Sequence, residues 1–118
     1  METFKITRIY NDTKGDSHFE DVAVSLHEAG SIGALSDLVT AQGVIFREVA
    51  PSYDYDFHTA PQRQYIVLLE GEIEIETSLG EKRIFGAGEV LLVEDTIGKG
   101  HKTRNMRHEK RRSLFIPL

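Results

Sequence analysis

Apolar and polar residues alternate with a period of two along most of the chain, a pattern typical of strands with one buried and one wet face. The clearest case is EIEIE at 72–76, in which the isoleucines face one way and the glutamates the other. Turn residues separate the alternating segments. We expect a strand after the glycine-containing loop at 96–100, and further strands at 3–10, 18–26, 43–49, 64–69, 72–78, 82–88, 88–95 and 112–118.

Two segments fall outside this pattern. Residues 28–43 are rich in glycine and other small residues, and we expect a loop there with one helical turn. Residues 50–61 hold two prolines that bracket an extended segment. No segment favours a helix of about ten residues or more. Short strands with turn residues every eight to twelve positions or so predict an all-β barrel or sandwich, and 118 residues form a single domain.

Composition and charge narrow the possible functions. The chain has no cysteine, which excludes disulfides, zinc–thiolate sites, iron–sulfur clusters and thiol catalysis. Its net charge of −5 argues against nucleic acid as a partner. No apolar run is long enough to span a membrane, and METFKITRIY lacks the apolar core of a signal peptide. We therefore expect a cytoplasmic protein that binds neither nucleic acid nor membrane.

Candidate chemistry gathers in the segment at 53–65, YDYDFHTAPQRQY. His58 and Gln64 have the same parity, so a continuous strand directs both side chains into one cavity. A bulge at Pro61 breaks this parity and makes Gln62 the inward amide instead. Both arrangements place an imidazole and an amide side by side.

A second histidine follows the apolar strand at 88–95. Asp95 ends that strand, and His101 comes six residues later, across a loop that contains Gly98 and Gly100. An aspartate at this spacing can fold back to the histidine and orient its ring. We treat contact between Asp95 and His101 as a hypothesis for the structure to test.

The spacing of these residues resembles the first motif of the cupins, which are small jelly-roll proteins. That motif is a His-x-His pair, followed by a glutamate and then by a glycine seven positions further on. Gly71 matches the glycine and His58 the first histidine, while Ala60 stands in place of the second histidine and Gln64 in place of the glutamate. The first motif then covers about 52–71.

The second cupin motif is a glycine-acid turn, a strand, a short loop, a histidine, and an asparagine four positions after it. Gly88 with Glu89 matches the turn, His101 the histidine and Asn105 the asparagine, so this motif covers about 88–105. The resemblance implies one cupin domain over 1–118, built as a jelly-roll β-barrel of two antiparallel sheets. Within the cupins, the chain is similar to compact bacterial proteins with a degenerate metal motif.

A complete cupin site holds a divalent metal on three histidines and one glutamate, which the resemblance reduces here to His58, Gln64 and His101. These three residues are the candidate ligands for iron, manganese, nickel or zinc. The amide brings no negative charge, so affinity for the ion is reduced. A carboxylate from residues 54, 56 or 95 restores that charge if it reaches the site.

The resemblance leaves three functions open for a small polar metabolite bound in the barrel. The first is a metal-dependent enzyme of oxygenase, lyase or isomerase type. The second is a metal-free isomerase or epimerase, with His58 or His101 as base, Asp95 orienting it, and Tyr53, Tyr55 or Tyr65 as acid. The third is a binding module without catalysis.

Further candidate residues concern the ligand and a second subunit. Arg47 in the strand at 43–49 can clamp a carboxylate or phosphate with two hydrogen bonds, or can form a salt bridge within the protein. Tyr55 and Gln62 are the other candidate ligand contacts. We expect a homodimer, in which the apolar strands at 3–10 and 113–118 pair across a two-fold axis.

Overall fold

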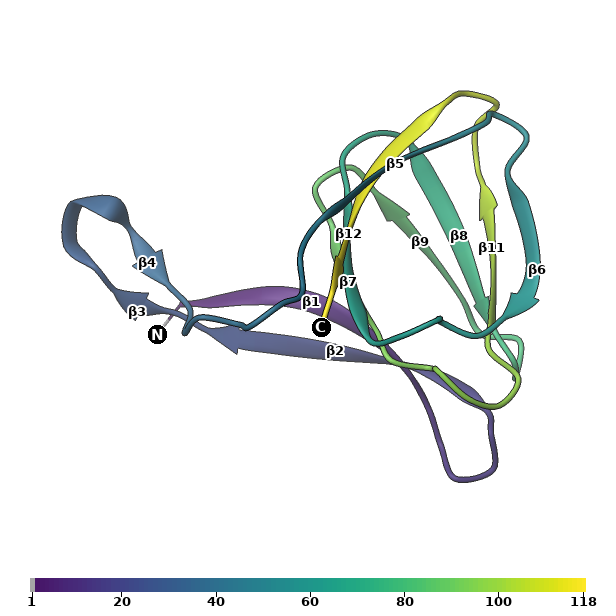
Figure 1. The fold of residues 1–118 in the computed structure, drawn as a ribbon, viewed down its shortest axis with the longest axis horizontal. Helices are drawn as coiled ribbons and strands as arrows, with labels where there is room; N and C mark the ends of the chain where they lie inside the picture. Colours follow the sequence, from purple (N-terminus) through teal and green to yellow (C-terminus); the bar gives the residue numbers. More distant parts are fainter. Residues whose placement is uncertain (1) are drawn as a thin grey trace.

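Two sheets dominate the computed structural model, which describes residues 2–118 (Figure 1). The six-stranded sheet has the order β2-β1-β10-β7-β12-β5. Its strands are β1 (Thr3–Asn11), β2 (Ser17–Ser25), β5 (Ile45–Val49), β7 (Gln64–Leu68), β10 (Val90–Val93) and β12 (Arg111–Pro117). The four-stranded sheet has the order β6-β11-β8-β9. Its strands are β6 (Asp54–His58), β8 (Glu72–Thr77), β9 (Lys82–Gly86) and β11 (His101–Asn105).

The core lies between these two sheets and follows the predicted alternation. Along β8 the residues at 73, 75 and 77 are buried and those between them are partly exposed. Isoleucines 73 and 75 pack with Leu68, Phe85, Leu91 and Val93 in one cluster. Each fully buried aliphatic side chain of this kind contributes about 1.5–3 kcal/mol to folding. The all-β class predicted from the alternation is confirmed.

The pairing of β1 differs from the expected set of antiparallel ladders. β1 and β10 run parallel, with Thr7 opposite Leu91 and Ile9 opposite Val93. The other strand pairs are antiparallel. Alternation alone does not report strand direction, because a parallel and an antiparallel neighbour bury the same face of a strand.

The expected pairing of the first and last strands across a two-fold axis has little free main-chain edge to use. β12 lies between β7 and β5, and β1 lies between β2 and β10. The β1–β10 register covers only residues 7–9, so within the described chain residues 3–6 of β1 have no ladder partner on that side. The homodimer and its strand pairing therefore stay predictions.

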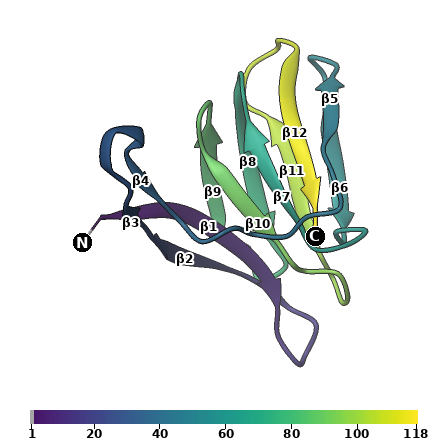
Figure 2. The same cartoon turned by 60° about the vertical axis from the view of Figure 1, so that its left-hand side comes forward.

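The irregular segment forms an arm that projects away from the two sheets (Figures 1 and 2). It contains the short strands β3 (His27–Glu28) and β4 (Ala34–Leu35), which pair with each other, and the 3-10 turn Gly30–Ile32 between them. The predicted helical turn is therefore present, although the two-stranded ladder was not expected. Within residues 2–118, no helix has the length and apolar character needed to cross a bilayer.

Candidate functional site

A cavity of about 310 Å³ opens between the two sheets. It is lined from the six-stranded sheet by β5, β7, β10 and β12, and from the four-stranded sheet by β6, β8 and β11. Part of its lining is aliphatic, whereas two histidines, two arginines, two tyrosines, two threonines and a glutamine supply the polar groups. The polar and aromatic lining residues are Arg47, Tyr53, Tyr55, His58, Thr59, Gln64, His101, Thr103, Arg111 and Phe115.

Asp95 and His101 form a buried pair at one end of this cavity. Nδ1 of His101 lies 2.5 Å from Oδ2 of Asp95, and the side chains are 6% and 0% exposed. Because an ionised carboxylate only accepts hydrogen bonds, Nδ1 is the donor and carries the proton. Nε2 of His101 makes no hydrogen bond within residues 2–118, so it is the ring nitrogen available to a ligand.

A glycine holds this pair against the neighbouring strand. Gly100 has a φ of +73°, and a β-carbon there would overlap the backbone carbonyl of His58. Only glycine allows the loop after β10 to approach β6 this closely. His101 then pairs directly with His58 in the β11–β6 ladder, which brings their ring centroids to 4.6 Å.

His58 lies beside His101 in a neutral form. Its Nδ1 donates to the backbone carbonyl of Asp56 at 2.8 Å, which leaves Nε2 as an acceptor. Burial lowers the pKa of the His58 imidazole, and the positive charge of Arg47 acts in the same direction, against the Asp56 hydrogen bond and the Asp95 carboxylate. The Tyr55 ring packs on it at a centroid distance of 3.9 Å.

The amides at 62 and 64 take different places. Gln64 is 4% exposed and lines the cavity with His58. The two are not on one continuous strand, since β6 ends at His58 and β7 begins at Gln64. Gln62 lies outside the cavity lining, where its side-chain oxygen accepts a hydrogen bond from Gln42 at 3.3 Å. Gln62 was expected to contact the ligand, but its side chain does not line the cavity.

Tyr65 does not line the cavity either. It follows the inward-facing Gln64 on β7 and therefore points to the opposite face of the sheet. Tyr53 and Tyr55 are the tyrosines in the cavity. Asp56 accepts a hydrogen bond from the backbone N–H of Phe57 and is exposed. Neither it nor Asp54 lines the cavity.

Arg111 is a cavity residue that the sequence analysis did not single out. It begins β12 and is 2% exposed, with its guanidinium over the Tyr53 ring at 5.4 Å. Burial lowers the pKa of Arg111 to about 10, and repulsion from Arg47 contributes to this. The sequence signal is parity: Arg111 lies four positions before Phe115 on one strand, so both face the same side, and both line the cavity.

The donor set of this cavity does not fit a divalent cation. Two imidazoles and the amide of Gln64 are present, but the one buried carboxylate, Asp95, contacts His101. No group of three or more histidine, aspartate or glutamate side chains within residues 2–118 is arranged to hold a metal ion. Arg47 and Arg111 add positive charge to the same space, which opposes cation binding.

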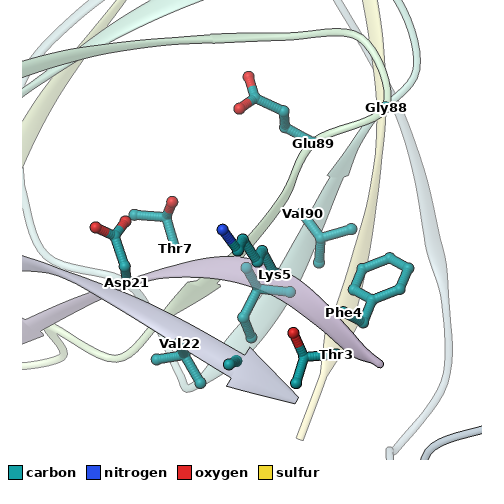
Figure 3. Close-up of a pocket in the computed structure, with 11 residues that line it drawn as sticks. Thr3, Phe4, Lys5, Thr7, Asp21, Val22, Gly88, Glu89 and Val90 are labelled. Carbon is teal, nitrogen blue, oxygen red and sulfur yellow. The ribbon is translucent and has the colours of Figure 1, made fainter. Parts of the chain in front are cut away.

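A larger hollow lies on another part of the molecule (Figure 3). It measures about 650 Å³ and is formed by β1, β2 and the turn before β10, with Lys5, Asp21 and Glu89 as its charged residues. It shares no residue with the cavity between the sheets. It has no histidine or buried ion pair, so we place the candidate site in the smaller cavity.

Comparison with solved structures shows the fold. The chain is similar to the Cnp3 cupin domain of Schizosaccharomyces pombe, with 12% identity, coverage of 100% of this chain and 86% of that chain, and a TM-score of 0.50. Drosophila melanogaster CENP-C bound to CAL1 matches at 14% identity, over 80% of this chain and 76% of that chain, with a TM-score of 0.52. These likenesses confirm the cupin-like fold that the two motifs predicted.

A third similar structure is the protein NMB1881 from Neisseria meningitidis. It is 21% identical, with coverage of 68% of this chain and 78% of that chain and a TM-score of 0.50. No protein-family model matches the chain, and no curated protein matches its sequence. At these identities the likeness extends to the fold and not to the chemistry of the site.

Proposed function

We propose that this cupin-fold protein binds a small polar metabolite between its two sheets and moves a proton on it without a metal, as an isomerase or epimerase. The observation that carries the proposal is the contact between Nδ1 of His101 and Asp95 inside the cavity wall. A carboxylate on Nδ1 fixes the ring tautomer and stabilises the imidazolium that forms when Nε2 accepts a proton. His101 is the proposed base and Asp95 its positioning residue.

The proposed reaction begins at a carbon beside a carbonyl group of the ligand. Nε2 of His101 takes the proton as the C–H bond breaks, and the electron pair passes to the carbonyl oxygen. That oxygen takes a proton from the hydroxyl of Tyr55, which lines the cavity against His58. If the starting carbon carries a hydroxyl group, the product is an enediol: His101 returns its proton to the former carbonyl carbon while the other hydroxyl gives its proton to the Tyr55 phenolate, which completes isomerisation. In epimerisation, a proton from water reaches the opposite face of the starting carbon, the enol hydroxyl returns its proton to Tyr55, and His101 releases its proton to water.

His58 is the residue that we propose to act with Tyr55 in this reaction. Its lowered pKa keeps the ring neutral near pH 7, so Nε2 can accept a proton or a hydrogen bond. The aliphatic lining around the two imidazoles lowers the local dielectric constant, which strengthens each of these polar contacts. The large aliphatic lining residues are Ile66, Ile73, Ile75, Leu91 and Val93.

A two-stage experiment tests this function. Metabolites are first screened for a rise in melting temperature, because a ligand that binds the folded state stabilises it by mass action. Each hit is then incubated with enzyme in D2O, and deuterium at carbon is measured by NMR. We expect incorporation with the wild type, its loss in His101→Gln, and its retention in the control His108→Gln, which changes an exposed residue.

The two alternatives give different results in the same experiment. A non-catalytic binding module gives thermal shifts for the hits but no deuterium in any of them. A metal enzyme copurifies with near-stoichiometric iron, manganese, nickel or zinc in elemental mass spectrometry, and loses exchange when a chelator is added. Exchange that survives both the chelator and the absence of bound metal supports the proposed acid–base function.

A further inference from the structure

Two arginines in the cavity lack the partners that other arginines of the protein have. Neither Arg47 nor Arg111 forms an ion pair with a carboxylate within residues 2–118. Five other arginines pair with glutamate or aspartate at the surface: Arg8, Arg63, Arg83, Arg104 and Arg112. One buried arginine and one partly exposed arginine without an ionic partner therefore lie in the cavity between the sheets.

Arg111 is fixed in position, but its hydrogen-bond donors are not all paired. Its Nε donates to Oδ1 of Asn105 at 3.0 Å, and its aliphatic stem packs over Gly71, where a β-carbon would lie 3.1 Å from Cγ. Nη2 is buried without any hydrogen-bond partner. A guanidinium has five N–H donors, and the neutral amide oxygen of Asn105 brings no charge to balance it.

Arg47 shares the aromatic surroundings of Arg111. Its guanidinium lies 4.9 Å from the Tyr53 ring and 4.8 Å from the Phe115 ring. Arg111 is over the same Tyr53 ring, so two positive groups share one aromatic neighbour. Aromatic faces attract each cation but do not remove the repulsion between the two.

No carboxylate of the cavity is free to neutralise this pair. Asp95 contacts His101, which lies at the start of β11, whereas Asn105 and the Arg111 guanidinium lie at its other end. Four residue steps separate His101 from Asn105, which corresponds to about 13 Å along the strand. Within the described residues, no negative charge therefore pairs with the two arginines.

We propose that Arg47 and Arg111 bind an anionic group of the ligand, a carboxylate or a phosphate, at the end of the cavity opposite His101. This inference rests on the proposed function for the position of the ligand. Paired guanidinium groups match the planar or tetrahedral oxygens of these anions with several hydrogen bonds. The substrate class is then a small organic anion, with its charge at one end and its reacting carbon at the other.

Three probes of matched shape test the inference: D-glucose, D-glucuronate and D-glucose 6-phosphate. All three have the same ring and the same anomeric end, and the two anions differ from glucose only at the far carbon. Melting temperature is measured at constant ionic strength with each probe at about 100 mM, since weak ligands stabilise detectably only at high concentration. We expect a rise of about 5 °C with at least one anion and none with glucose.

Two methionine variants locate the effect. In Arg111→Met the rise should disappear, because methionine keeps the packing over Gly71 but has no charge. In the control Arg112→Met it should persist, because Arg112 is exposed and pairs with Glu48. The probe that gives the larger rise in melting temperature, D-glucuronate or D-glucose 6-phosphate, shows whether the site favours a carboxylate or a phosphate.

Other outcomes overturn the inference. Equal stabilisation by glucose and by the anions, anion effects that persist in Arg111→Met, or no stabilisation by either anion would each refute anion binding at this pair. None of these results bears on His101, because deuterium exchange is measured separately on ligands from the screen. If no ligand from the screen gains deuterium with the wild type, but the anions still raise the melting temperature, the proposed function is refuted and the anion site is retained.

Discussion

Replacing Arg111 with methionine should make the protein more stable. A buried charge with no ionic partner lowers stability, and the pKa of Arg111, lowered to about 10 by burial and by Arg47, reports the size of this effect. This lowering of the pKa from the ordinary value for arginine means that burial disfavours the charged guanidinium by about 3 kcal/mol. The lost hydrogen bond to Asn105 offsets about 1 kcal/mol of this.

The net gain in the free energy of unfolding is then about 2 kcal/mol, because methionine also preserves the contact with Gly71. For a chain of this length, that gain corresponds to about 8 °C in melting temperature. Urea denaturation followed by far-UV circular dichroism measures it directly, since the chain has no tryptophan for fluorescence. The control Arg112→Met should stay within about 0.5 kcal/mol of the wild type.

A loss of stability in Arg111→Met, with an unchanged denaturant slope, would refute this reasoning. It would mean that the guanidinium has favourable interactions beyond the one hydrogen bond to Asn105. A gain in stability together with weaker anion binding would instead identify Arg111 as a residue kept for its ligand, since stability and function then change in opposite directions.

Three further predictions concern the histidine end of the cavity. Asp95→Asn should lower deuterium exchange by about 10²–10⁴-fold, because the amide favours the wrong tautomer of His101; a wild-type rate would contradict its positioning role. Because the folded-state pKa of His58 lies below its unfolded value, the unfolded chain binds more protons, and stability falls as pH drops below about 6.5. Denaturation at several pH values should show a flatter dependence in His58→Gln, and equal slopes would argue against this. Gly100→Ala should cost about 3 kcal/mol or more, against about 1–2 kcal/mol for the open control Gly80→Ala at a similar positive φ; equal losses in urea denaturation would show that the close approach is unimportant.

The fold was largely predictable because period-two alternation depends only on local burial. The strand predicted at 72–78 from alternating isoleucines and glutamates is observed at Glu72–Thr77. The two motif spacings then indicated a cupin-like jelly roll, which the comparisons with solved structures confirm. The parallel pair β1–β10 was not predictable, because direction and neighbour identity depend on contacts between distant parts of the chain.

The candidate site was predictable where chemistry and spacing coincided. Asp95 and His101 could be paired because six residues with two glycines allow the loop to fold back. Tyr65 and Gln62 were named for their chemistry, but strand parity at 65 and the loop conformation at 62 direct them away from the cavity. Arg111 was missed because a charged residue beside other basic residues is usually solvated.

The parallel pairing of β1 has a consequence for how the chain folds. The β1–β2 hairpin closes over a short turn, so it can form early, but its junction with the sheet needs residues 90–93, which come much later in the sequence. Long-range pairing of this kind is slow, because loop closure precedes any gain from contacts. During synthesis, the apolar side chain of Ile9 therefore stays exposed until Val93 has been made and the two strands can pair. A chain stalled before residue 90 would present an open, aggregation-prone edge at β1.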